Sequence, residues 1–279
     1  MFKLLSGVFF TVAAQAAPIL YTIGASQTGV PNQLVRIDVA STAVTTLATL
    51  GNGSQSFAGG LVGGTNDFFG AFMNGGGGQT VFVFTTSTGV TLPFAVFPEF
   101  SPGGLTMQVS PQNFFWTSND SNGNSTLVTS IPGMGGPIGT GFTGGLAYRE
   151  TNSTLYAIRN DSNGNSTLHY FNTNTSQMVQ LGINLGSGFL GGLVWDPASD
   201  LFYALGSDAN ANATLYRFAA GDATPTALFG IGQGYLYAAL SVGAIFEPTP
   251  SGGGVPEPST YLLCGAAIVA ITLVNRRSR

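Results

Sequence analysis

The sequence predicts an all-β protein, a five-bladed β-propeller of four-stranded antiparallel blades, followed by a C-terminal transmembrane helix. Three observations lead to this fold class. A motif recurs with a period near 45 residues, which is typical of propeller blades. Each copy contains four short apolar runs separated by turn-rich pieces, which indicates four strands. Two partial copies at the ends of the repeat region complement each other, so N- and C-terminal strands are expected to close the ring.

The repeat is clearest from Phe142 to Gly186, where it begins with the motif Phe-x-Gly-Gly-Leu. Other copies of this motif occupy residues 57–61, 100–105 (with one extra residue) and 189–193, and a weaker copy occupies 235–240. The final leucines of successive copies lie 44, 41, 47 and 47 residues apart. Each motif is therefore expected to form the first strand of a blade.

The Gly-Gly pair of the motif has a physical interpretation. First strands line the central channel of a propeller, where blades converge, and glycine suits a strand that another backbone approaches closely. Residues this small favour a narrow channel and hence few blades. The alternative is that the pair marks an ordinary bulge or turn.

Residues 20–50 resemble the later part of a repeat, without its first strand. Leu20-Tyr-Thr-Ile matches Leu155-Tyr-Ala-Ile, and residues 34–38 match residues 168–172. The C-terminal copy at 235–242 supplies only a first strand. Joined, the two fragments make one complete blade, which removes the open edges that β-proteins avoid.

A polar hairpin is expected between the second and third strands of each blade. The sequence from Asn119 to Leu127 is repeated without change at 160–168 and in degraded form at 207–215. Either its Asp-x-Asn-Gly-Asn core is part of a calcium loop, without the later Glu that completes one, or it is a turn capped by Asp; the turn is favoured. Weak candidates for a site on this rim are Asn74, Asp120, Asp161 and Asp208.

Composition argues against most kinds of chemistry. Only 7% of the residues are charged, and residues 18–246 contain four Arg, no Lys and ten acidic residues, so nucleic acid is not an expected partner. The single cysteine, Cys264, allows no intrachain disulfide, and no cofactor or metal motif is present. His169 is the only histidine and lies in an expected strand. The protein is therefore not expected to be an enzyme, although paired rim carboxylates in a polysaccharide hydrolase are the alternative.

Both ends of the chain carry targeting features. Residues 1–16 read as a secretory signal peptide, with an apolar run and an Ala-x-Ala cleavage site. Residues 17–246 form the predicted ectodomain, and residues 247–258 a Pro- and Gly-rich linker. Residues 259–279 then form a predicted transmembrane anchor with a basic tail.

The C-terminal segment has three parts in a fixed order: the motif Val255-Pro256-Glu257-Pro258-Ser259, an apolar stretch, and the basic residues Arg276, Arg277 and Arg279. In this it resembles the PEP-CTERM sorting signal of exported Gram-negative proteins. The resemblance covers about 25 residues and implies an exosortase-type processing enzyme as partner. The apolar run of 14 residues is shorter than the roughly 20 that span a bilayer.

The resemblance implies a protein held in the inner membrane until it is processed, and then found at the cell surface or outside the cell. We expect a binding or structural role there, with an extracellular polysaccharide or matrix component as ligand.

Overall fold

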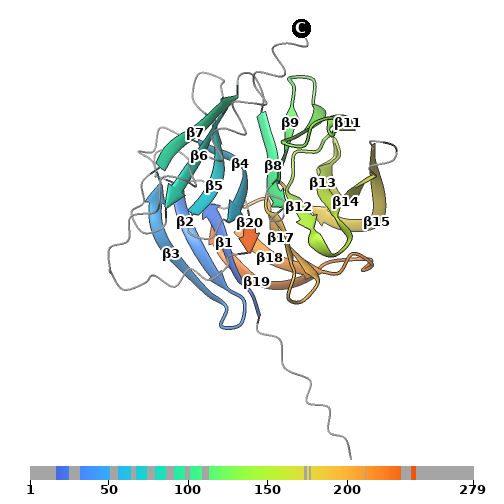
Figure 1. Cartoon of the computed structure of the whole chain (residues 1–279). Coiled ribbons are helices and arrows are strands. Elements are labelled where there is room, and N and C mark those ends of the chain that lie inside the picture. Colours follow the sequence, from blue (N-terminus) through green and yellow to red (C-terminus); the bar gives the residue numbers. More distant parts are fainter. Residues whose placement is uncertain are drawn as a thin grey trace, which may run out of the picture.

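The protein is an all-β propeller (Figure 1). The computed structural model describes residues 17–24, 32–50, 56–63, 67–73, 79–85, 91–97, 101–108, 113–172, 175, 177–210, 212–233 and 240–242, with backbone alone for residues 32, 48, 50, 56–97 and 101–103. The predicted signal peptide, the linker, the sorting motif and the anchor lie outside these ranges, as does Cys264.

The strands form four-stranded antiparallel sheets, each named here by its order along the chain. The closing sheet has the order β20 (Leu240–Val242), β1 (Ile19–Gly24), β2 (Asn32–Asp38), β3 (Ala43–Leu50). The second sheet contains β4 (Ser56–Gly63), β5 (Asp67–Met73), β6 (Gln79–Thr85) and β7 (Thr91–Phe97). The third contains β8 (Ser101–Gln108), β9 (Asn113–Asn119), β10 (Asn124–Thr129) and β11 (Gly136–Thr140). The fourth contains β12 (Leu146–Arg149), β13 (Thr154–Asn160), β14 (Asn165–Asn172) and β15 (Gln177–Ser187), and the fifth β16 (Leu193–Asp196), β17 (Leu201–Ser207), β18 (Asn212–Phe218) and β19 (Thr226–Gln233).

The first strands of the sheets surround one axis (Figure 1). Going round the ring, β20 contacts β4, β4 contacts β8, β8 contacts β12, β12 contacts β16, and β16 contacts β20 again. The outer strands, such as β3 and β15, lie at the periphery. Sheets that follow one another in the sequence are thus also neighbours in the ring. This is expected for repeated units that each bury their faces against the next unit.

The two ends of the repeat region meet in the closing sheet. Strand β1 pairs with β20 in antiparallel register, with Leu20 opposite Val242 and Thr22 opposite Leu240. The other long side of β1 pairs with β2. The expected closure by N- and C-terminal strands is thus confirmed, although β20 is described only as Leu240–Val242 instead of the expected 235–242.

The helical part of the predicted fold class requires correction. Among the described residues, the helical structure consists of one short 3-10 helix, η1 (Glu150–Asn152). In that part of the chain no helix has the length and apolarity needed to cross a membrane. The segment on which the prediction rested, the apolar run of residues 261–274, lies outside the described residues.

The Gly-Gly pairs lie where neighbouring first strands almost touch. A Cβ atom on Gly104 would lie 2.2 Å from the backbone N of Leu146, and one on Gly145 would lie 2.2 Å from the backbone N of Leu193. No side chain fits at such distances, so the interpretation of close backbone approach is confirmed. In β8 the pair also coincides with a register shift between Pro102 and Leu105, so the bulge interpretation holds there as well.

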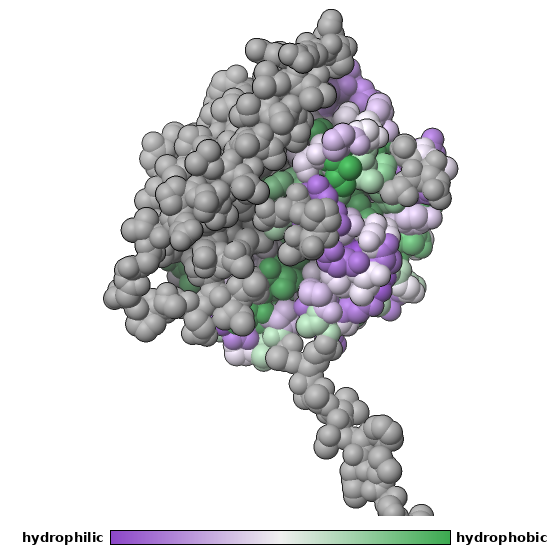
Figure 2. Space-filling model, in the orientation of Figure 1, coloured by the Kyte–Doolittle hydropathy of each residue, from purple (hydrophilic) through white to green (hydrophobic). Residues whose placement is uncertain are grey.

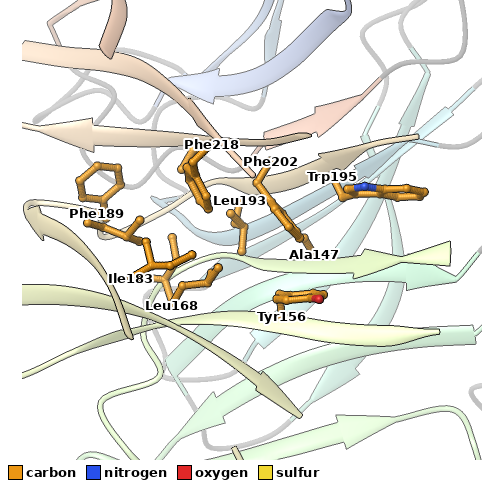
Figure 3. Packing of buried hydrophobic residues seen from close by; sticks show 12 residues of the cluster. Ala147, Tyr156, Leu168, Ile183, Phe189, Leu193, Trp195, Phe202 and Phe218 are labelled. Carbon is orange, nitrogen blue, oxygen red and sulfur yellow. The ribbon is translucent and has the colours of Figure 1, made fainter. Parts of the chain in front are cut away.

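The hydrophobic core is divided among the interfaces between sheets. One cluster joins the fourth and fifth sheets, and Figure 3 shows Tyr156 and Leu168 facing Phe202 and Phe218 across that interface. Another cluster joins the third and fourth sheets, and a third joins the fifth and closing sheets. Phe202 is completely buried and stacks with Phe218 at a centroid distance of 5.7 Å. Burying each such side chain contributes about 2–3 kcal/mol to folding.

Candidate functional site

The repeated hairpins form tight turns at one end of the strands, and both carboxylate oxygens of each hairpin Asp accept hydrogen bonds within the turn. In the third sheet, Oδ1 of Asp120 accepts hydrogen bonds from the backbone N–H groups of Asn122 and Asn124, both at 2.8 Å. Its Oδ2 accepts a third bond from Nδ2 of Asn124 at 2.8 Å. Gly123 takes a φ of +79°, which glycine adopts without strain. This is the Asp-capped turn favoured from the sequence.

The other two copies repeat this arrangement. Asp161 accepts bonds from Asn163 and Asn165, and Asp208 accepts bonds from Asn210 and Asn212, with distances of 2.8–3.0 Å. The asparagine hydrogen bonds, above all those of Asn124, Asn165 and Asn212, hold the pKa of each carboxyl below its usual range. Asn74, the remaining rim candidate, lies outside the described residues.

The turn geometry limits the chemistry of these carboxylates. Both oxygens of Asp120, Asp161 and Asp208 accept hydrogen bonds from within their own turns. A general acid must hold a proton near neutral pH, whereas these groups have a lowered pKa. Among the residues the structure describes, no group of three His, Cys, Asp or Glu side chains could hold a metal ion.

The two hairpins of identical sequence also hold the chain segment that leads into the next sheet. In the third sheet, Ser125 Oγ donates to Asn119 Oδ1 at 2.5 Å and accepts a bond from the backbone N–H of Phe142 at 3.0 Å. Asn119 Nδ2 donates to the backbone oxygen of Phe142 at 3.4 Å. The repeated Asn and Ser therefore form a latch, defined here as this Asn–Ser pair with its Phe partner.

The latch recurs one sheet further on. Ser166 Oγ donates to Asn160 Oδ1 at 2.6 Å and accepts from the backbone N–H of Phe189 at 3.3 Å. Ser166 is fully buried. In the degraded third copy, Ser207 and Ala213 replace the Asn and Ser, and the methyl group of Ala213 forms no such bonds. The repeat has therefore lost its latch at the junction of the fifth and closing sheets.

Sequence reasoning missed a second motif that completes the latch. The segments from Ile138 to Phe142 and from Leu185 to Phe189 share the pattern Ile/Leu-Gly-x-Gly-Phe. Ile138 and Leu185 are the extra residues of register shifts and are buried. A Cβ on the last glycine, Gly141, would lie 2.2 Å from the backbone oxygen of Asn160, so only glycine fits. The recurrence of this pattern at Phe142 and Phe189 was the sequence signal that could have revealed the motif.

The opposite end of the strands carries a different inter-sheet contact. Asp196 caps the turn before β17 by accepting bonds from the backbone N–H groups of Ala198 and Ser199. Asp200 accepts bonds from Nε of Arg149 at 2.9 Å and from Nε1 of Trp195 at 2.9 Å. The Arg149 hydrogen bond lowers the pKa of Asp200.

His169 lies within β14, as expected, but it is buried and does not face solvent. Its Nε2 lies 3.1 Å from Thr167 Oγ1, and its ring meets the edge of Phe142 at a centroid distance of 5.2 Å. Nδ1 is buried and has no hydrogen-bond partner. Burial lowers the pKa of His169 to about 4, so the imidazole is neutral at pH 7.

Solved structures with a similar fold come from several classes of protein. The chain is similar to TolB from Acinetobacter baumannii, with a TM-score of 0.53 and 9% identity, over 79% of this chain and 55% of that one. It thus spans about half the length of the TolB chain. It is also similar to the SapL1 lectin in complex with alpha methyl fucoside (TM-score 0.48, 9% identity, 77% and 81% covered). A candidate 6-phosphogluconolactonase from Bacteroides fragilis gives a TM-score of 0.45 at 8% identity (82% and 99% covered).

No family model matches the sequence, and no curated protein matches it. At these identities the structural likeness shows the propeller fold alone. Any role for this chain therefore has to be inferred from its own residues.

Those residues form a rim of polar turns with a repeated shape. Asn122 and Asn163 lie exposed at the tips of two hairpins with the same sequence and hydrogen-bond pattern. Where described residues reach the face shown in Figure 2, hydrophilic and hydrophobic residues alternate in small patches. Such a surface offers amide and hydroxyl groups without a strong charge.

Proposed function

We propose that this is an exported surface or extracellular-matrix protein whose propeller binds a repetitive polysaccharide or matrix component. The observation that carries the proposal is the repeated rigid hairpin, which presents the same amide and hydroxyl groups from neighbouring sheets. A polymer with a regular repeat can contact several such turns at once, so weak contacts add through effective concentration.

The roles of the acidic residues support binding over hydrolysis. Asp120, Asp161 and Asp208 are used in their own turns, and Asp200 is paired with Arg149. A glycosidase needs two free carboxyl groups on either side of the scissile bond. No observation on these residues favours the hydrolase.

A binding measurement tests the ligand half of the proposal. The purified protein should bind a subset of polysaccharides on a glycan array, without releasing products from them. Replacing Asn122 and Asn163 together by Ala should weaken that binding, because both tips lose their amides. Asn152→Ala, at the opposite end of the strands, is the matched control. Unchanged binding by the double variant, or turnover of a bound glycan, would contradict the proposal.

The sorting half of the proposal rests on the C-terminal sequence. We propose that residues 259–279 anchor the protein until an exosortase-type enzyme processes it near Pro256-Glu257-Pro258. Replacing these three residues together by Ala should leave export intact and keep the protein in the membrane fraction. Replacing Thr249, Pro250 and Ser251 in the linker by Ala is the control. Normal release of the triple variant at 256–258 would refute this half without touching the binding half.

A further inference from the structure

The two hairpins of identical sequence carry Asn-Gly pairs at their tips, Asn122-Gly123 and Asn163-Gly164. All four residues are exposed. A Cβ atom added to Gly123 or to Gly164 would meet nothing within 4 Å, so the space around each glycine is open. The turns use the backbone N–H groups of the two asparagines, and within the described part of the chain neither carboxamide is hydrogen-bonded. Both side chains are therefore free to react.

The reacting atoms belong to consecutive residues. The carboxamide carbon of Asn122 lies next in the chain to the backbone nitrogen of Gly123, which can attack it and close a five-membered imide ring. Glycine favours this step because it has no side chain to obstruct the ring and reaches more backbone conformations than other residues. The N–H of Gly123 donates to the backbone oxygen of Asp120 at 3.0 Å, and the fourth sheet repeats this bond. Attack therefore requires the turn to open, which exposed loop tips do at a small cost in free energy.

We propose that Asn122 and Asn163 are sites of spontaneous deamidation. In the first step, the glycine nitrogen forms a bond to Cγ of the preceding asparagine, and the bond from Cγ to the amide nitrogen breaks. The amide leaves as ammonia with the proton of the attacking nitrogen. In the second step, water adds to one of the two imide carbonyls and one C–N bond of the ring breaks. The product is aspartate or isoaspartate, depending on which bond breaks, and no oxidant, reductant or enzyme takes part.

The degraded third hairpin provides an internal comparison. Asp208 accepts hydrogen bonds from the backbone N–H groups of Asn210 and Asn212, as its counterparts do in the two identical hairpins. Asn210 is exposed as well, but Ala211 follows it in place of glycine. The third turn therefore shares these hydrogen bonds and differs in the attacking residue. Deamidation should be fast in the first two hairpins and slow in the third.

Deamidation changes the surface to which the ligand is proposed to bind. The hydrogen bonds from Asn124 and Asn165 lower the pKa of Asp120 and Asp161, so both carboxylates are ionised at neutral pH. Each event replaces a neutral amide by a second carboxylate two residues from an ionised one. The affinity for a polysaccharide should therefore fall as the protein ages. This fall in affinity rests on the proposed function, whereas the deamidation itself does not.

Residue-resolved mass spectrometry tests the modification. The full chain is incubated in detergent and mildly alkaline buffer, and samples are digested at intervals. Trypsin cleaves after Arg159 and Arg217, so Asn163 and Asn210 are measured in the same peptide. Asn163 should deamidate at least about tenfold faster than Asn210, because only glycine leaves the attacking nitrogen unobstructed. Replacing Ala211 by Gly should raise the rate at Asn210 towards that at Asn163.

The comparison within the wild-type protein requires no variant. Rates at Asn122 and Asn163 that are no faster than the rate at Asn210, or an unchanged rate at Asn210 in Ala211→Gly, would overturn the proposal.

The effect on binding is measured separately. The double variant Asn122→Asp, Asn163→Asp carries the aspartate product at both tips and should bind more weakly than the wild type to the same glycan array. Weaker binding by the double alanine variant but not by the double aspartate variant would overturn the fall in affinity with age. Unchanged binding by both double variants would show that the proposed binding surface is wrong, and the measured deamidation would still stand.

Discussion

Arg149 on β12 and Asp200 in the turn before β17 form a two-point ion pair that joins the fourth and fifth sheets. Nε of Arg149 bonds one carboxylate oxygen, and its NH2 group bonds the other. Asp200 has a φ of 57°, a left-handed conformation that Asp and Asn accept more readily than other residues. The same carboxylate accepts the indole N–H of Trp195.

Replacing Asp200 by Asn should remove the charge and keep both the left-handed backbone and the indole contact. Because the carboxylate is exposed, we expect only a small loss, with a melting temperature lower by about 1–3 °C in low salt. The difference should shrink in about 0.5 M salt. A double-mutant cycle with Arg149→Gln checks the assignment. Strictly additive effects would show that the pair does not contribute.

Replacing Ser166 by Ala should destabilise the protein more strongly. The change leaves the buried N–H of Phe189 and the oxygen of Asn160 without their partner, which costs about 1–3 kcal/mol. Chemical denaturation measures the loss. Ser162→Ala, an exposed position in the same hairpin, should change the free energy of unfolding by less than about 0.5 kcal/mol. Equal effects for the two variants would exclude the latch.

The stability of the protein should fall as the pH is lowered from about 6.5 towards 4. In the unfolded chain His169 binds a proton near pH 6.5, whereas in the folded protein its pKa is about 4. Between these values the unfolded state holds more protons, so acid favours unfolding. The loss between pH 7 and pH 5 is about 2 kcal/mol.

His169 is the only histidine, so its replacement isolates this effect. The variant His169→Leu should show a flatter dependence of the free energy of unfolding on pH between 5 and 7, whatever its absolute stability. The same slope in both proteins would mean that another group titrates there.

Removing calcium should have little effect on the fold. The hairpin carboxylates of Asp120, Asp161 and Asp208 already accept hydrogen bonds from their own turns. Chelation should therefore shift the melting temperature by less than about 1 °C, which is small against 2–4 °C for each kcal/mol in a domain of this size. A fall of more than about 5 °C would revive the calcium-loop hypothesis.

The repeat made much of the fold predictable. Strand positions follow from apolar runs between turns, and the pairing of β1 with β20 follows from two fragments that each lack what the other supplies. The Gly-Gly pair could be interpreted because only a residue without a side chain lets another backbone approach so closely. A Cβ atom added to Gly104 or Gly145 would lie 2.2 Å from a backbone N. These features are local, or repeat at a fixed interval.

The contacts between sheets were harder to foresee. Ser125 and Asn119 look like ordinary turn residues in the sequence, and their bonds to Phe142 depend on how a later segment folds back. The exposure of Leu47 depends on a register shift that no residue pattern announces. The helix predicted for the C-terminus rested on the hydropathy of residues 261–274, which lie outside the described residues.

The pairing of β1 with β20 also sets the order of events in biosynthesis. Tyr21 emerges from the ribosome early and waits for Ser241, its partner from the far end of the repeat region. Until residues 240–242 are synthesised, one hydrogen-bonding edge of β1 has no partner strand. A chaperone that binds extended strands would find its substrate during this interval, and the interval ends when residues 240–242 arrive.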